Sequence, residues 1–222
     1  HYLSGGAALA TDLRAAALDA AGNLASCSGD YDRAKMLFEE QLTLEQQLGG
    51  ERGIADALHN LSSVAWKHSN YGEARALEEK SLALRRKLAD KSAIAASLHA
   101  LGTFAHEQGD YQPAAALYEE ALAIRRQLGD AGSIATLLNN MGNLAQAQGN
   151  PEQVRALQEE SLTIRRTIGD KAGIAQSLNN LAVLALEQAD YNRARTLMEE
   201  SLAIDRELGN KKNLIVINDE GH

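Results

Sequence analysis

The sequence predicts an all-α fold, an α-solenoid of antiparallel helical hairpins. The first observation is self-similarity at a spacing of 40 residues, seen in Tyr31, Tyr71, Tyr111 and Tyr191 and in Leu42, Leu82, Leu122, Leu162 and Leu202. The second is that apolar residues within each repeat lie three and four apart, which is typical of a helix that packs along one face. The third is that short turn and capping signals separate the helical stretches. Repeats of this length bury their apolar faces only against their neighbours, so one elongated domain is expected.

The repeat 91–130 shows both helices of a hairpin. A first helix is predicted over 91–108, where glycine at position 109 supplies the left-handed conformation that ends many helices. Asp110 is then placed as the N-cap of a second helix over 111–128. Pro113 falls in the first turn of this helix, where proline removes no intrahelical hydrogen bond. The turn and cap recur at Gly129 and Asp130, where the next repeat begins.

The chain divides on this pattern into five repeats with a segment at each end. The repeats cover 12–50, 51–90, 91–130, 131–170 and 171–210. Residues 1–11 are interpreted as the end of a preceding hairpin or a linker, with a break at Gly5-Gly6 before a first helix that starts at Asp12. Residues 211–222 are interpreted as a partial sixth helix or a cap. In the fourth repeat, Val154 and Gln158 replace an alanine and an aromatic residue, which predicts looser packing there.

Composition excludes several classes of function. The 222 residues include 22 basic and 30 acidic side chains, and the formal charge is −8 without a basic cluster, so no nucleic-acid binding is expected. No apolar run approaches the roughly 18 residues of a membrane span. The single cysteine, Cys27, excludes an internal disulfide and is in keeping with a reducing, cytoplasmic location. Only 4% of the residues are aromatic, so alanine and leucine must fill most of the core.

The repeat also resembles a known family. Leu101 and Gly102 precede Ala114 by about one helix length, and Tyr118 and Ala121 follow at spacings of four and three. This pattern resembles the tetratricopeptide repeat, and the 40-residue variety is similar to the arrays of kinesin light chains and of bacterial multidomain signalling NTPases and transcription regulators. The resemblance implies a right-handed superhelix in which the first helices line a concave groove. It further implies a scaffold that binds proteins or peptides.

Carried over by position, the resemblance places polar side chains in this groove. The candidate partner-binding residues are His59, Asn60, Trp66, His99, Thr103, His106, Asn139, Asn140, Asn143, Asn179 and Asn180. An asparagine amide offers donors and an acceptor together, which suits the backbone of an extended peptide. The alternative is that the asparagines cap neighbouring turns or bond between adjacent helices. Trp66 is either a contact for a partner side chain or a cover for the groove wall beside a neighbouring helix.

Neither a metal site nor a catalytic site is predicted. His59 and His99 occupy equivalent positions and His106 lies two turns further on, but no carboxylate or thiolate is suitably spaced to complete a zinc site. Pairs of glutamates and pairs of arginines recur in the second helices. Adjacent helical residues point about 100° apart, so a glutamate pair cannot flank one bond, and solvated, mutually paired charge on the back face is expected. The arginines could alternatively receive an acidic partner surface.

The sequence therefore predicts a protein-interaction module rather than an enzyme, with no cofactor. Its groove is expected to bind a segment of another protein, or of another domain of a larger signalling protein. The alternative is a structural spacer or sensor arm that associates weakly with other copies through its exposed ends.

Overall fold

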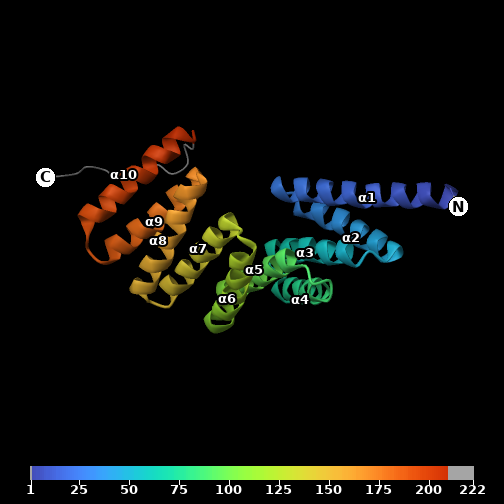
Figure 1. Cartoon of the computed structure of the whole chain (residues 1–222), viewed down its shortest axis with the longest axis horizontal. Helices are drawn as coiled ribbons and strands as arrows, with labels where there is room; N and C mark the ends of the chain where they lie inside the picture. Colours follow the sequence, from blue (N-terminus) through green and yellow to red (C-terminus); the bar gives the residue numbers. More distant parts are fainter. Residues whose placement is uncertain (1, 210–222) are drawn as a thin grey trace. The chain divides into compact units, whose positions relative to one another are not determined.

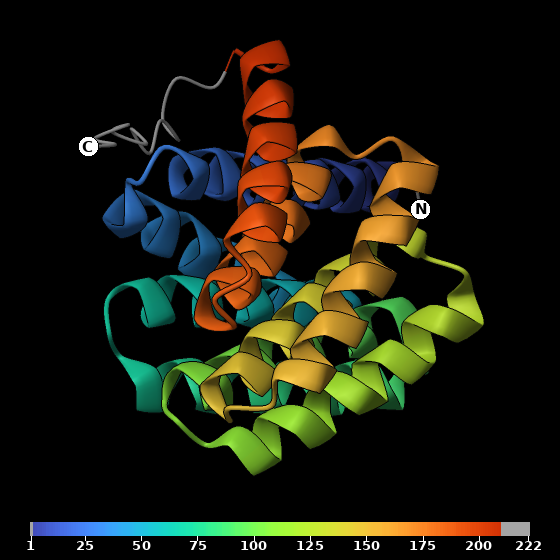
Figure 2. The same ribbon diagram turned by 90° about the vertical axis from the view of Figure 1, so that its left-hand side faces the viewer.

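The computed structural model describes the backbone of residues 2–209 and the side chains of residues 13–209. This part of the chain forms ten helices and no strand (Figure 1). They are α1 (Tyr2–Cys27), α2 (Tyr31–Leu48), α3 (Glu51–Lys67), α4 (Tyr71–Lys87), α5 (Lys91–Glu107), α6 (Tyr111–Leu128), α7 (Ala131–Ala147), α8 (Pro151–Ile168), α9 (Lys171–Glu187) and α10 (Tyr191–Glu207). Successive helices run antiparallel, as the two views in Figures 1 and 2 show. The predicted all-α fold of helical hairpins is confirmed.

The helices group into two compact units, one up to Ile124 and one from Arg125 onward. In the N-terminal unit, each of α1 to α4 packs against the next helix, and α1 also touches α3. In the C-terminal unit, α7, α8, α9 and α10 pack in the same consecutive manner. Each hairpin therefore contacts its neighbours in sequence within its own unit, as a repeat architecture requires.

Alanine and leucine supply much of the core, as composition predicted. The second helices bury a small residue at equivalent positions: Ala34, Ala74, Ala114, Val154 and Ala194. The first helices α5, α7 and α9 bury Leu98, Leu138 and Leu178 completely. Small side chains on one helix let the next helix approach closely, so a core with few aromatic residues remains well packed.

Two predictions about local structure are wrong. Helix α1 is continuous from Tyr2 to Cys27 and does not break at Gly5-Gly6, because a glycine within a helix costs only about 1 kcal/mol and does not forbid helical conformation. The fourth repeat is also not loosely packed, since Val154 and Gln158 are 2% and 0% exposed and a Cβ atom on Gly142 would lie only 2.6 Å from Nε2 of Gln158. The segment 211–222 lies outside the described residues. The division into five repeats stays a prediction, although every described helix from α2 to α10 falls within one of them.

Candidate functional site

An open cavity of about 590 Å³ lies in the N-terminal unit, and we call it the α1–α3 cavity. Helices α1, α2, α3 and α4 and the turn before α3 contribute its lining: Ala15, Ala16, Asp19, Asn23, Gln41, Glu45, Gly50, Arg52, Gly53, Asp56, His59, Asn60 and Arg85. Two predicted partner-binding residues, His59 and Asn60, lie in this wall. Nine of the thirteen lining residues are polar or charged, so the cavity offers hydrogen-bonding groups to an occupant beside its apolar surface.

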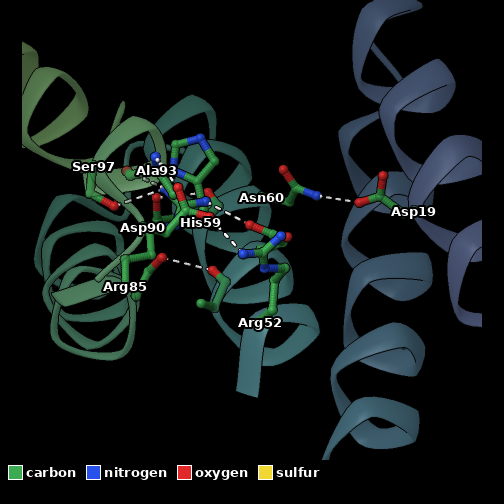
Figure 3. Close-up of polar contacts among 12 residues, drawn as sticks. Asp19, Arg52, His59, Asn60, Arg85, Asp90, Ala93 and Ser97 are labelled. Carbon is green, nitrogen blue, oxygen red and sulfur yellow. Dashed lines mark hydrogen bonds and ion pairs between the residues drawn. The ribbon is translucent and has the colours of Figure 1, made fainter. Parts of the chain in front are cut away.

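Asn60 connects two first helices across this cavity. Its Nδ2 donates to Oδ1 of Asp19 on α1 at 2.8 Å, as Figure 3 shows. Nδ2 of Asn23, one turn after Asp19 on the same helix, donates to the other carboxylate oxygen at 3.0 Å. Asp19 is therefore held by two neutral amides. The arrangement orients its carboxylate without neutralising it.

His59 covers a buried carboxylate. Its Nδ1 lies 2.9 Å from Oε1 and 3.0 Å from Oε2 of Glu78, and the hydroxyl of Ser62 donates to Glu78 as well. Glu78 is 0% exposed and stands where the first and third repeats have Phe38 and Tyr118. Because a buried carboxylate is stable only with hydrogen-bond partners, His59 and Ser62 are the compensation for this replacement. Only part of the His59 imidazole remains available to a partner.

Trp66 packs between two repeats rather than standing free. Its ring stacks on Phe104 with centroids 4.2 Å apart and an interplanar angle of 11°, and it lies 4.5 Å from the ring of Tyr71. Its indole Nε1 donates to Oε2 of Glu107 at 2.8 Å. These contacts match the alternative in which the tryptophan covers the wall of a neighbouring helix. Its face toward Phe104 is not accessible to a partner.

The other candidates on α5 lie beside tyrosines. The ring of His99 is 5.9 Å from that of Tyr118, and the ring of His106 is 6.1 Å from that of Tyr111. Tyr118 donates its hydroxyl hydrogen to Oγ1 of Thr103 at 3.3 Å, and burial raises the pKa of Tyr118, so the phenol stays neutral. Thr103 also donates to the carbonyl oxygen of His99 at 3.0 Å. His99, Thr103 and His106 thus form a half-buried polar row on α5.

The predicted asparagine cluster forms in the C-terminal unit and bridges two first helices. Nδ2 of Asn180 on α9 donates to Oδ1 of Asn139 at 2.9 Å and to Oδ1 of Asn143 at 3.3 Å on α7. Asn139 is only 2% exposed. It therefore serves helix packing, the alternative stated for the asparagines. Asn143 is exposed, and Asn140 and Asn179 are partly exposed.

The expectation that all paired arginines are solvated is wrong for the first arginine of two pairs, Arg85 and Arg165. Arg85 and Arg165 are 5% and 3% exposed. Arg165 donates to the carbonyl oxygen of Gly173 at 2.6 Å, to Ser177 at 2.9 Å and to Gln176 at 3.0 Å. Arg85 makes the equivalent bonds to Ala93 and Ser97 and an ion pair with Asp56 at 2.9 Å. Arg85 and Arg165 therefore each hold the first helix of the next repeat in place through hydrogen bonds. In the sequence, the only sign of this shared role is that the two arginines recur at a multiple of the 40-residue spacing.

The second arginine of each pair behaves as predicted. On the surface, Arg86 pairs with Glu120 at 2.8 Å, Arg126 with Glu160 at 2.8 Å and Arg166 with Glu200 at 2.5 Å. We call these three ion pairs the surface ladder. In each, the arginine and the glutamate are 34 residues apart. Exposed pairs of this kind contribute up to about 1 kcal/mol each, so they align the second helices more than they stabilise them.

Within residues 2–209, no group of three or more histidine, cysteine, aspartate or glutamate side chains is arranged to hold a metal ion. In the same part of the chain, no helix is both long and apolar enough to cross a membrane.

The hairpins are consecutive and antiparallel, and in three of them a glycine of the first helix (Gly22, Gly102, Gly142) lies against a large side chain of the second (Phe38, Tyr118, Gln158). These features define the class of tetratricopeptide-like helical arrays. The sequence pattern of the tetratricopeptide repeat matches residues 13–87, 79–127 and 133–207. The chain belongs to the tetratricopeptide repeat family. No curated protein matches the sequence as a relative.

Solved structures share this fold at low sequence identity. One contains the nearly identical tetratricopeptide-like repeats of a putative kinesin light chain from Podosopora anserina, with 20% identity, a TM-score of 0.72 and coverage of 90% of this chain and 97% of that one. A Rap protein complexed with competence and sporulation factor has 14% identity and a TM-score of 0.75, over 85% of this chain and 53% of that one. A signal transduction ATPase with a tetratricopeptide repeat sensor from Pyrococcus horikoshii has 18% identity and a TM-score of 0.79, over 87% and 30%.

Proposed function

We propose that this chain is a non-catalytic protein-interaction module that binds a peptide segment of another protein, or of another domain of a larger signalling protein, along its first helices. The observation that carries the proposal is the polar α1–α3 cavity, whose wall includes His59 and Asn60. A Rap conjugation gene regulator of the plasmid pLS20, whose structure in complex with the Phr* peptide has the same fold, supports a peptide as the occupant. The exposed thiol of Cys27 suits a reducing compartment, and the proposal places the chain in the cytoplasm.

The side chains proposed to contact the peptide are those that remain accessible. On the C-terminal unit these are Asn143, which is exposed, and Asn140 and Asn179, which are partly exposed. Asn139 and Asn180 are proposed to position them through the bond between their side chains. On the N-terminal unit, His59, Asn60, Trp66, His99, Thr103 and His106 offer their partly exposed edges. Each amide that gains a peptide hydrogen bond contributes about 1 kcal/mol to binding.

The test is selection of a random peptide library displayed on phage against the purified chain, followed by calorimetric titration of the enriched peptides. Asn143→Ala combined with Asn179→Ala is expected to weaken binding of a peptide that contacts the C-terminal unit at least about fivefold. Asn192→Ala, an exposed asparagine on the second helix α10, is the matched control and should leave the affinity unchanged. Failure to enrich any peptide above an unrelated helical protein would refute the proposed function.

A second function, self-association, is favoured by one observation. Val183 and Leu186 on α9 are 47% and 42% exposed, at positions where the preceding repeat has Asn143 and Gln146. Exposed apolar residues beside each other on a helix are typical of an interaction surface. Sedimentation velocity at high protein concentration should then show a weak dimer. The double substitution Val183→Asn and Leu186→Gln, which copies the preceding repeat, should restore the monomer, and a strict monomer in the unaltered chain would exclude this function.

A further inference from the structure

The α1–α3 cavity has an oriented negative charge on one wall. Both oxygens of Asp19 accept hydrogen bonds, one from Asn60 (Figure 3) and the other from Asn23, and both donors are uncharged amides. An amide fixes the direction of a carboxylate but leaves its charge in place. Asp19 is therefore ready to accept a further, charged donor. Asn60 and Asn23 hold the Asp19 carboxylate at the wall of the cavity between α1 and α3, where a donor from a ligand would meet it.

The positive groups of the same cavity already have anionic partners. Arg85 donates to Asp56 at 2.9 Å, and Arg52 forms an ion pair with Asp90 at 3.2 Å. Among the lining residues, carboxylates outnumber guanidinium groups three to two, because Glu45 adds to Asp19 and Asp56. An anionic ligand would have to displace one of these carboxylates and then face Asp19. The cavity is thus electrostatically selective against anions.

A second, independent feature is a buried acceptor without a partner. Gln41 lines the cavity from α2 and is 4% exposed, and its Oε1 is closed to solvent and has no hydrogen-bond partner among the described residues, so a donor in the cavity reaches it only after the side-chain amide turns. A buried amide oxygen is unfavourable until a donor reaches it. Both an ammonium and a guanidinium group carry several donors, so either could satisfy a carboxylate and an amide oxygen at once. The volume of about 590 Å³ is large enough for one long side chain with its adjoining backbone.

From these observations we infer that the α1–α3 cavity binds a lysine or arginine side chain of the bound peptide, with Asp19 as its counter-charge and Gln41 as a second acceptor. This inference rests on the proposed function, since it names the chemistry of the peptide that the module recognises. It predicts that binding weakens as salt concentration rises, because an ion pair open to solvent is screened.

The direct test uses a small probe and nuclear magnetic resonance. N-acetyl-L-arginine methylamide is titrated into 15N-labelled protein, and the side-chain amide signals of Asn23 and Asn60 are followed. The citrulline analogue has nearly the same shape without the charge, and it should bind at least about tenfold more weakly, as expected for loss of a charge-assisted hydrogen bond. Equal binding of the two probes, or no saturable response to the arginine probe, would overturn the inference without relying on any variant.

A charge-removing variant adds a second test. Asp19→Asn keeps the size of the side chain and should reduce binding of the arginine probe at least about tenfold. Asp32→Asn removes the same charge from an exposed position on α2 outside the cavity lining, and should have no effect. Undiminished binding in Asp19→Asn, with the fold intact by circular dichroism, would contradict the inference.

The peptide selection separates this inference from the proposed function. Enriched peptides should share a lysine or arginine whose replacement by alanine weakens binding to the unaltered chain but not to Asp19→Asn. Peptides that bind without any basic residue would uphold the module and refute the role of the cavity. An absence of any binding peptide would refute the proposed function itself.

Discussion

At the scale of single residues, neighbouring side chains of the same type have opposite roles. Arg165 is 3% exposed and bonds to the next helix, whereas Arg166 is exposed and belongs to the surface ladder. Burial lowers the pKa of Arg165, yet its partners on α9 keep the guanidinium in place. A buried charge with several hydrogen bonds is costly to disrupt, because the carbonyl and hydroxyl groups that it satisfies remain buried afterwards.

The first prediction compares these two arginines. Arg165→Ala should lower the free energy of unfolding by at least about 2 kcal/mol, since it leaves the carbonyl oxygen of Gly173 without its 2.6 Å donor. Arg166→Ala should cost less than about 1 kcal/mol, the usual range for an exposed ion pair. Urea denaturation of the two variants measures the difference. Similar losses in both would contradict the structural role assigned to Arg165.

At the scale of the helical element, the interior of each hairpin is set by a pair of positions. The first helix supplies Gly22, Ser62, Gly102, Gly142 or Ala182, and the second helix supplies Phe38, Glu78, Tyr118, Gln158 or Met198. A Cβ atom on Gly102 would lie 2.7 Å from Cδ1 and Cε1 of Tyr118. The two positions therefore constrain each other. A small first residue permits a large second one.

This constraint gives the second prediction. Gly102→Ala should destabilise the chain by about 1 kcal/mol or more, because the cost of overpacking exceeds the gain in helix propensity. Gly72→Ala is the control, since a Cβ there would meet nothing within 4 Å, and it should stabilise α4 by a few tenths to about 1 kcal/mol. Thermal unfolding distinguishes the loss of stability expected for Gly102→Ala from the gain expected for Gly72→Ala. Stabilisation by both substitutions would show that Tyr118 moves aside freely.

The third prediction concerns the cap of α7. Hydrogen bonds from Ser133 lower the pKa of Asp130, and Arg125, whose Nη1 donates to Asp130 at 3.0 Å, acts in the same direction. A carboxylate whose folded pKa lies below its unfolded value of about 3.9 stabilises the fold above that pH. The contribution is lost as the pH falls through the folded value. The stability difference between the unaltered chain and Asp130→Asn should therefore shrink between pH 6 and pH 3.

Urea denaturation at several pH values measures this difference. The contributions of the other titrating groups cancel in it, because both proteins contain them. Circular dichroism at pH 3 confirms that both remain folded before denaturant is added. A stability difference that stays constant across the range would mean that the charge of Asp130 does not support the cap.

At the scale of the whole molecule, the sequence predicted the repeats but not the bonds that join them. The recurring Tyr111 and Leu122 positions were sufficient for the hairpins, because periodic apolar residues and turn signals are local properties. The candidate site was harder to predict from the sequence. Asn60 meets Asp19 in the preceding repeat, and Glu78 meets His59 on the partner helix. A side chain that bonds across helices looks the same in sequence as one that faces solvent, so the sequence leaves open whether Asn139 and Trp66 contact a partner or pack between helices.

The fourth prediction follows from the repeat architecture. Leu101 is 7% exposed in a central hairpin, and Leu101→Ala should cost about 2–5 kcal/mol, as expected for a buried leucine. Leu13 on α1 is 65% exposed, and Leu13→Ala should change stability by less than about 0.5 kcal/mol. Guanidinium denaturation followed by circular dichroism compares them. A larger loss at Leu13 would imply that stability is concentrated in α1 rather than in the central hairpins.

The surface ladder also bears on how such a chain can change in length over evolution. Its arginine and glutamate stand 34 residues apart in every rung, and the bond from Asn60 to Asp19 and that from Asn180 to Asn139 each span 41 residues. Unequal recombination that adds or removes a whole 40-residue repeat preserves the separation within the surface ladder, since Arg86, Arg126 and Arg166 recur at that spacing, as do Glu120, Glu160 and Glu200. A gene encoding this chain can therefore gain or lose a repeat in one step. A deletion of any other length would misalign every rung that spans it.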